Sequence, residues 1–502
     1  MPRSSARAFA ALLACAALLP RAFADEPAAP PPFPDKPTLA LEDCIARALK
    51  KNFDLQIQSF STDVARESLN AANATFEPTL TGSFQRGVTQ AAPAAGGSRN
   101  DFTDARLGVS EFVVTGATLS LSTSLDRNAG GFVSSTGQFT SGAFNPVYGS
   151  DVALTVTQPL LKGAGPGVSR AAIERGRLGL AIARLNFKGR VLQVVRDTEA
   201  AYFNLVFARE NLDVKQHSLA LAQQLLDENK TRRITGVATD LDVLSAEVGV
   251  ANARNGVVVA RQSVHNSEDA LLALIGQFGF DSELGTVALL PFQDPSPSFD
   301  LSYKLARENQ PDYLAAKAAV KQLEIDARTS KNAALPTLNL GGSLGYSGVD
   351  RSYRGAVDRV PHGEANSWEL DLTFSLPWGL HADRARYRSA VASLHQEETR
   401  VQQIDQDLLV QVRAAVRAVD TNRESVDINA KATELAAHQY ELELARFKAG
   451  LSTSRQVLQT QDDLEQARVN ELLARVNLRV AIANLHELEA SSLERYHITV
   501  AD

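Results

Sequence analysis

The chain has 502 residues, of which 44% are hydrophobic and 22% charged, and its formal net charge is −7. This acidic balance excludes a broadly basic nucleic-acid binder, and two cysteines exclude a disulfide scaffold or a cysteine-rich zinc module. None of the 20 prolines lies in 167–290 or 378–502. Because an interior proline costs about 3 kcal/mol in a helix, these two tracts predict very long helices.

Residues 1–24 have the pattern of an export signal. Arg3 and Arg7 precede an apolar run that is too short to cross a bilayer, and Ala22-Phe23-Ala24 is a small-x-small cleavage site. A lipoprotein signal that lipidates Cys15 is an open alternative. Residues 25–40 are rich in proline, so we expect an extended lead-in. The protein is expected to be exported, and to be periplasmic, secreted or in the outer membrane.

The rest of the chain contains an internal duplication. A shift of 214 residues aligns 170–274 with 384–488 without a gap, and a shift of 258 aligns an earlier segment around Pro78 and Pro336. The two shifts differ because the first copy has a longer insert, between about 80 and 158, than the second copy has between 338 and 376. The expected organisation is a first repeat over 41–277, a joint over 278–300, a second repeat over 301–490 and a tail over 491–502.

Each copy has the order helix, strands, helix, turn, helix. From Tyr387 to Val426, and again from Ile173 to Leu212, apolar residues recur in alternating steps of four and three. This period predicts coiled-coil-like packing. At 1.5 Å per residue, a continuous helix over 170–230 would span about 90 Å, so we expect an elongated molecule.

Two turns separate the helices of the predicted hairpins. Each combines a basic residue at a helix C-terminus, a glycine suited to a left-handed position, and a threonine that can cap the next helix with a polar partner three residues later. These residues are Arg232, Gly236, Thr239 and Asp242 in the first turn, and Arg446, Gly450, Thr453 and Gln456 in the second. Local helix chemistry alone explains them.

Period-two segments lie between the helices, within 79–158 and 338–376. In 368–376, for example, Trp368 and alternate residues up to Leu376 are apolar. One apolar face over about ten residues is typical of membrane β-strands, and a soluble sheet with one buried face is the alternative. One chain offers four to six such strands, but single-chain barrels begin at eight. If these segments are membrane strands, several chains must pool them, since open sheet edges are forbidden in lipid.

The order and duplication of these motifs resemble the TolC family of outer-membrane efflux and secretion channels over nearly the whole mature chain. The residues that carry the resemblance lie at the helix–strand transitions and after the two turns. They are Phe76-Glu77-Pro78-Thr79-Leu80, Leu335-Pro336-Thr337-Leu338, Gln158-Pro159-Leu160-Leu161-Lys162-Gly163, Asp242-Val243-Leu244 and Gln456-Val457-Leu458.

The resemblance implies a mostly α protein with membrane β-structure. Three copies would form a periplasmic helical barrel and share one β-barrel in contact with outer-membrane lipid. The implied partners are a periplasmic membrane-fusion adaptor and an inner-membrane pump of the resistance-nodulation-division or ABC type, in an efflux pump or a type I secretion system. The adaptor-docking residues carried over by position are Arg232, Gly236, Val237, Thr239, Arg446, Gly450, Leu451 and Thr453.

Two features depart from the family pattern. Some members carry an acidic constriction after the second turn, where this chain has Gln456 and Gln459, with Asp462 and Asp463 further on. We therefore expect a glutamine-lined periplasmic aperture with weak divalent-cation block. The long first insert also predicts an extra hairpin over 105–127. If it enters the barrel, a trimer has eighteen strands; we favour twelve, because the helical tunnel must match the barrel that it feeds.

The sequence offers no motif for catalysis. It lacks HExxH, CxxC, a Walker loop and a G-x-S-x-G elbow, so we expect no enzyme, no cofactor and no metal site. The expected function is a passive export duct that is driven by its partner pump, with no nucleic-acid partner. The alternative is a periplasmic coiled-coil adaptor or scaffold without a pore, in which strands would not direct apolar residues toward lipid.

Overall fold

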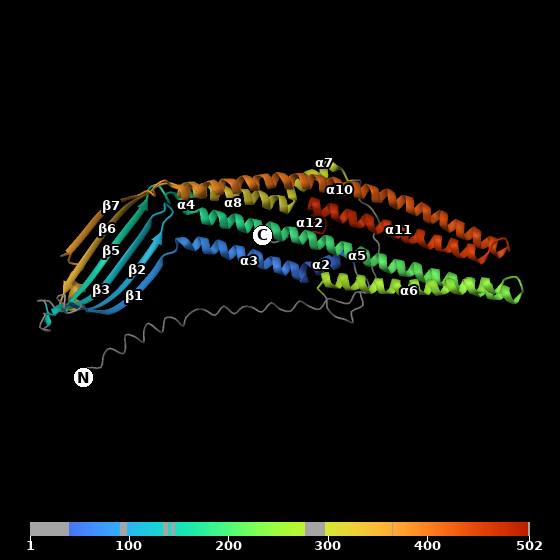
Figure 1. Cartoon of the computed structure of the whole chain (residues 1–502), viewed down its shortest axis with the longest axis horizontal. Coiled ribbons are helices and arrows are strands. Elements are labelled where there is room, and N and C mark those ends of the chain that lie inside the picture. The colour runs from blue at the N-terminus through green and yellow to red at the C-terminus, as the bar shows by residue number, and fades with distance from the viewer. Residues whose placement is uncertain are drawn as a thin grey trace, which may run out of the picture.

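The computed structural model describes residues 40–90, 98–133, 139–141, 146–276, 297–363 and 365–499. The predicted export signal, Cys15, the proline-rich lead-in up to residue 39 and most of the inter-repeat joint lie outside these residues. The molecule is elongated, with a β-sheet at one end and two long helical hairpins that reach to the other (Figure 1).

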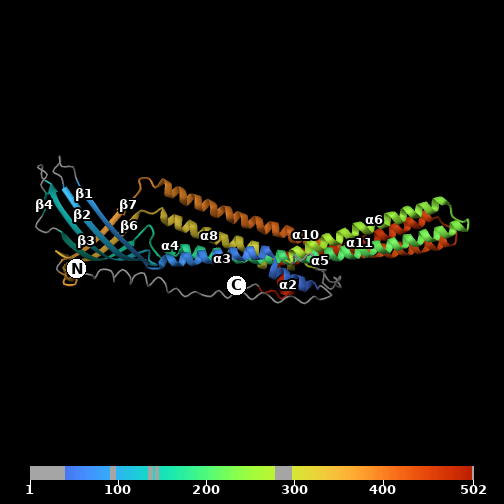
Figure 2. The same cartoon turned by 90° about the horizontal axis from the view of Figure 1, so that it is seen from below.

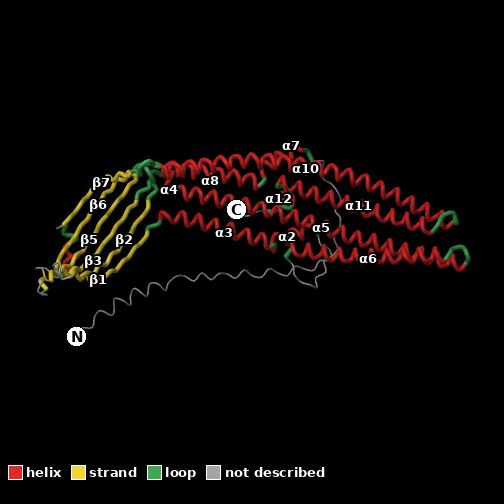
Figure 3. Tube along the Cα trace, viewed as in Figure 1, coloured by secondary structure: helices red, strands yellow, loops and turns green. Residues whose placement is uncertain are grey.

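Helices account for most of the described chain, as Figure 3 shows in red. Helix α5 is continuous over 64 residues and α10 over 68, which confirms the prediction of very long helices. No helix among the described residues is long and apolar enough to cross a membrane. The helices are α2 (Leu41–Lys51), α3 (Phe53–Asn73), α4 (Pro166–Ser169), α5 (Ala171–Ile234), α6 (Asp240–Leu274), α7 (Phe299–Asn309), α8 (Pro311–Ala333), α9 (Tyr353–Arg359), α10 (His381–Lys448), α11 (Ser454–Glu489) and α12 (Ser492–Arg495), with a 3-10 turn at Ala74–Phe76.

The strands form one antiparallel sheet in the order β1-β2-β3-β5-β6-β7, and the short β4 pairs with β3. The first repeat supplies four strands of this path and the second supplies two, which meet where β5 pairs with β6. The strands are β1 (Thr79–Gln90), β2 (Ser98–Phe112), β3 (Thr118–Val133), β4 (Phe139–Ser141), β5 (Val147–Pro159), β6 (Thr337–Asp350) and β7 (Ala365–Ser375).

The expectation of twelve strands in a trimer, which means four strands per chain, is wrong, because each chain has six strands along the path of its sheet. The extra hairpin does turn at Thr115-Gly116, but its arms β2 and β3 lie inside the sheet, between β1 and β5. The hairpin turn is also anchored to the end of β5 and to the connection that follows it. Gly165 donates its N–H to the Thr115 carbonyl oxygen at 3.0 Å, and Gln158 Nε2 donates to the same oxygen at 3.2 Å. In the described sheet, β2 and β3 link β1 to β5.

The register of the sheet separates its two faces. One row of directly paired residues crosses all six strands and is apolar throughout: Leu80, Val109, Leu121, Leu154, Leu344 and Trp368. The adjacent row on the opposite face is small or polar: Thr81, Gly108, Ser122, Ala153, Gly345 and Ser367. We call the first set the apolar row. Its members are 40% to 78% exposed in the single chain.

The helices continue from the sheet, as the turned view in Figure 2 shows, and they pack side by side in one layer. Near the sheet the packing order is α3-α5-α8-α10, and toward the tips it is α6-α5-α11-α10. One core cluster centres on α5, around Leu192 and Leu205, and another joins α10 to α11 around Val412 and Ile482. The layer therefore has two open edges, which are β1, α3 and α6 on one side and β7 and α10 on the other.

The anchored hairpin turn yields a stability prediction. Gly116 has φ +91°, and a Cβ at this position would lie 2.4 Å from the Gly163 carbonyl oxygen. We expect Gly116→Ala to lower the free energy of unfolding by about 1–3 kcal/mol through backbone strain and this clash. Gly342→Ala is the control, because a Cβ there meets no atom within 4 Å. Thermal melting in detergent, followed by circular dichroism, compares the two; equal midpoints would contradict the prediction.

Candidate functional site

The two hairpins turn at the end of the molecule farthest from the sheet (Figure 1). Gly236 has φ +78° and Gly450 φ +75°, so both occupy the left-handed position that was predicted. A Cβ at either glycine would meet no atom within 4 Å. The same amide-to-carbonyl bond closes both helices (Val237 N–H to Arg232 O, 2.8 Å; Leu451 N–H to Arg446 O, 2.9 Å).

Reciprocal capping boxes start the second helix of each hairpin, as predicted. In the first, Thr239 donates its N–H to Asp242 Oδ2 at 2.9 Å, and Asp242 returns its N–H to Thr239 Oγ1 at 3.2 Å. In the second, Thr453 and Gln456 exchange the corresponding bonds at 3.4 Å. Hydrogen bonds from the side chain and backbone of Thr239 lower the pKa of Asp242. The first cap is therefore held by a charged acceptor and the second by a neutral one.

Arg232 does more than neutralise the end of its own helix. Its guanidinium donates to the Phe447 carbonyl oxygen at 2.9 Å and to that of Lys448 at 3.3 Å, and it lies 4.1 Å from the centre of the Phe447 ring. It thereby ties the first tip to the end of α10. Its repeat equivalent, Arg446, instead pairs with Glu443 on its own helix at 3.1 Å. The repeat alignment treats the two arginines as equivalent, so it missed this difference.

Large apolar side chains project from the tips. Ile234, Val237, Leu241 and Leu451 are 70% to 87% exposed, and we call them the tip patch. Val237 and Leu451 were named from the sequence, whereas Ile234 and Leu241 were not. Ile234 ends α5 and Leu241 lies in the first turn of α6, so both flank the Gly236 turn. Their exposure in the structure identifies them. Such a patch is a candidate protein-contact surface.

Polar contacts join the two hairpins behind the tips. The buried Asn229 donates its Nδ2 to Ser454 Oγ at 2.8 Å. Further along the same interface, Gln461 Nε2 donates to the Ser218 carbonyl oxygen at 2.8 Å. Because buried polar groups are costly when unpaired, these bonds favour one register between α5 and α11.

The predicted aperture residues have separate surroundings. Gln456 is engaged in the cap, whereas Gln459 donates its Nε2 to Asp463 Oδ1 at 3.1 Å on an exposed surface. Asp462 lines a groove of about 260 Å³ between α5, α6 and α11, beside the ion pair of Lys215 and Glu465. Desolvation there raises the pKa of Asp462, and the nearby carboxylates add to the shift. The four residues therefore do not form one cluster.

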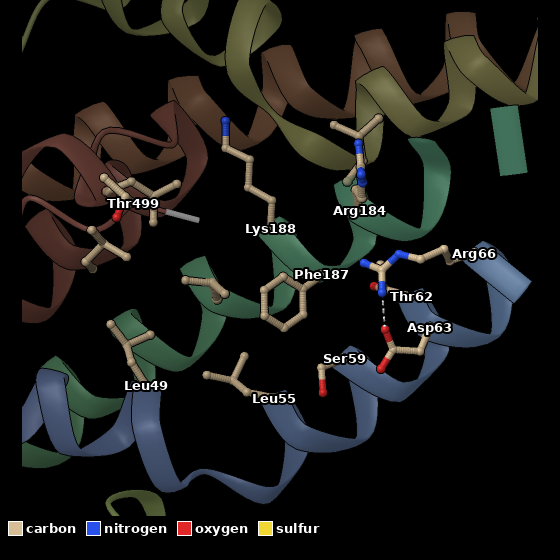
Figure 4. Close-up of a pocket in the computed structure, with 14 residues that line it drawn as sticks. Leu49, Leu55, Ser59, Thr62, Asp63, Arg66, Arg184, Phe187, Lys188 and Thr499 are labelled. Atoms are coloured by element: carbon tan, nitrogen blue, oxygen red, sulfur yellow. Dashed lines mark hydrogen bonds and ion pairs between the residues drawn. The ribbon is translucent and has the colours of Figure 1, made fainter. Parts of the chain in front are cut away.

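A larger cavity of about 690 Å³ lies nearer the sheet, between α2, α3, α5 and the C-terminal residues (Figure 4). Its wall includes Leu55 and Phe187, and an ion pair of Asp63 and Arg66 at 2.6 Å. In this lining the Ser59 hydroxyl donates to the Gln56 carbonyl oxygen at 2.7 Å, so it is engaged by the backbone of its own helix. Within the described residues, no group of three or more His, Cys, Asp or Glu side chains could hold a metal ion.

The unlike caps predict a pH response that differs between the tips. Because the folded pKa of Asp242 is lowered, its contribution is complete above the unfolded value, about 4, and is lost as pH falls through the folded pKa. Amide-exchange protection factors in the first turn of α6 should therefore decrease below about pH 4. The first turn of α11, capped through Gln456, is the internal control, and Asp242→Asn should remove the difference. Parallel loss at both tips would contradict this prediction.

Comparison with known proteins gives the same architecture. A family model described as outer membrane efflux protein matches residues 44–277 and 302–490. Outer membrane protein TolC of Escherichia coli (strain K12) is 26% identical over 191 residues, which are 37% of this chain and 38% of that relative. The sequence match thus spans well under half of the relative's length.

Solved structures resemble the chain over nearly its whole length. The CmeC outer membrane channel of Campylobacter jejuni matches with a TM-score of 0.67 at 17% identity, covering 92% of this chain and 90% of CmeC. The MtrE outer membrane channel of Neisseria gonorrhoeae, in its open state, matches with a TM-score of 0.64 at 17% identity, covering 89% and 88%. The structural likeness confirms the fold, and the family match, which covers most of the chain, shows that the chain belongs to the outer membrane efflux protein family.

Proposed function

We propose that the protein is the outer-membrane channel of a tripartite efflux pump or a type I secretion system. It acts as a passive export duct and takes its energy from a partner pump. The apolar row carries this proposal, because it crosses every strand of the six-strand path at one end of a molecule whose other end is two long helical hairpins. Exposed apolar side chains on every strand are expected to face lipid. With the sheet in the outer membrane, the hairpins extend into the periplasm.

The two open edges support assembly with further copies of the chain. Both carry exposed apolar residues at helical spacing, which a further copy would cover: Ile57, Phe60 and Val64 on α3, Leu244 and Val248 on α6, and Ile428, Leu435 and Leu442 on α10. The two edges differ, so contact between copies is head-to-tail and closes into a ring. The same ring pairs β1 with β7 and removes unpaired backbone from lipid.

Three copies, the number that the family resemblance implies, would place eighteen strands in the barrel. Barrels of 16 to 18 strands enclose an aqueous channel, and the polar face of this sheet would line it. Among the described strand residues, that face carries five carboxylates and one arginine per chain: Asp104, Asp126, Asp151, Glu369, Asp371 and Arg106. The excess of negative charge favours cations in the pore.

This excess gives the experiment that tests the duct. Protein purified from outer membranes and inserted in planar bilayers should conduct, and a KCl gradient should give a reversal potential of cation-selective sign. Glu369→Gln with Asp371→Asn should reduce that potential. Glu111→Gln is the control, since Glu111 pairs with Leu119 on the apolar face. A water-soluble monomer with no conductance would contradict the proposal and favour the alternative of an adaptor or scaffold without a pore.

The tip patch is the proposed docking surface for a periplasmic membrane-fusion adaptor, with Arg232, Gly236, Thr239, Arg446, Gly450 and Thr453 shaping the turns that present it. The exposed apolar side chains support this role, because docking would bury them. Gln459 and Asp463 are the proposed lining of the aperture just inside the tips. Gln456 belongs to the cap of α11, and Asp462 belongs to the groove between α5, α6 and α11.

Charged substitutions should test docking without disturbing the duct. Leu451→Glu should reduce, by at least about tenfold, the adaptor recovered with the protein from cross-linked cell envelopes, because a charge must be desolvated in the contact. Leu451→Met keeps the apolar surface and is the matched control. Conductance and oligomer mass should be unchanged in both variants. Equal adaptor recovery, measured by mass spectrometry, would exclude Leu451 from the docking surface.

A further inference from the structure

The connection between β6 and β7 contains a short helix, α9, that lies on the sheet. Because β6 runs away from α8, this connection lies at the end of the sheet remote from the long helices. It packs on the side that bears the apolar row. Gly348, two residues beyond Tyr346 on that face, approaches α9 so closely that a Cβ would lie 2.1 Å from the Ala356 carbonyl oxygen.

Three further contacts hold α9 in this position. The rings of Tyr148 and Tyr353 meet edge to face with centroids 4.5 Å apart. Arg359 forms an ion pair with Asp350 at 2.9 Å and donates to the Val349 carbonyl oxygen at 3.0 Å. The helix is therefore fixed to β5 and β6 by aromatic, ionic and backbone contacts.

A groove of about 780 Å³ opens between α9 and the strands β1, β2, β3 and β5. Its side-chain lining is mainly apolar and comes from both the sheet and the helix segment. The sheet contributes Phe84, Leu107, Leu125 and Val152, and the segment contributes Val357 and Pro361. The four sheet residues lie on the same face as the apolar row, so the groove is continuous with the surface that the proposed function turns to lipid.

Two arginines lie close in sequence to the α9 residues that line the groove, Arg354 three residues before Val357 and Arg359 two residues before Pro361. Arg354 is exposed on α9, and Arg359 remains exposed at the end of that helix although it contacts Asp350. A guanidinium binds phosphate oxygens with paired donors, so an arginine beside an apolar groove suits a ligand with a phosphate and a hydrocarbon tail. The groove volume lies within the range of ordinary ligand pockets.

We propose that this groove binds the acyl chain of an anionic membrane phospholipid whose phosphate contacts Arg354 and Arg359. The inference rests on the proposed function, because it needs the apolar face of the sheet to lie in lipid. The bound lipid would fill the space under α9 and continue the contact between barrel and bilayer. It would also satisfy positive charges at the end of the sheet remote from the helices.

Native mass spectrometry of the full-length protein in detergent tests the site, with added dioleoyl phosphatidylglycerol as the probe and dioleoyl phosphatidylcholine as the neutral comparison. We expect phosphatidylglycerol adducts that survive activation energies at which phosphatidylcholine adducts are lost. Ala105→Phe, which fills the groove, and Arg354→Ala, on an exposed residue, should each lower adduct occupancy at least about fivefold. Leu372→Phe on β7 and Arg417→Ala on α10 are the matched controls.

Each outcome is decisive. Loss of adducts in both groove variants but in neither control supports the site, and melting curves show whether Ala105→Phe has folded. Equal occupancy by the two lipids, or unchanged occupancy in Arg354→Ala, overturns it. Conductance is recorded on the same preparations. A conducting protein without retained lipid refutes this inference alone, whereas a protein with no conductance refutes the proposed function.

Discussion

The constraint on which this molecule depends is that neither its sheet nor its helical layer can close on itself. Six strands leave unpaired backbone groups along β1 and β7, and a bilayer cannot satisfy them. The helices meet the same limit, because α3 and α6 continue the β1 edge and α10 continues the β7 edge. One head-to-tail contact with a further copy would close both the sheet and the helical layer, and it would cover apolar residues such as Phe60 and Leu435, which are exposed on a single chain.

Duplication supplied two hairpins that share a plan and differ in detail. Both tips use a left-handed glycine and a threonine cap, yet only in the first is the cap acceptor charged. Arg232 reaches across to the end of α10, while Arg446 stays on its own helix. The contacts between hairpins therefore join unlike partners, and they fix the two tips relative to each other.

The local features were predictable from the sequence because they depend on neighbours in the chain. The long helices follow from spacing and missing proline, and Gly236 and Gly450 adopt the expected left-handed conformation. The strand number was not predictable in the same way. The alternating pattern marked both arms of the extra hairpin, but their membership of the sheet depends on pairing with β1 and β5. The expectation that the barrel matches the helical tunnel does not come from the strand residues themselves, and it favoured the wrong number of strands. The bridge made by Arg232 and the packing of α9 are likewise contacts between segments distant in sequence.

The unequal division of strands has a consequence for symmetry. Each repeat contributes one hairpin to the helical layer, so three chains would surround the periplasmic axis with six similar units. The sheet has no such regularity, since β1, β2, β3 and β5 come from one repeat and only β6 and β7 from the other. A trimer would thus change from approximate six-fold to strict three-fold symmetry where strands become helices. The Thr115 turn, anchored to Gly165, lies at that boundary and occupies the place for which the second repeat has no counterpart.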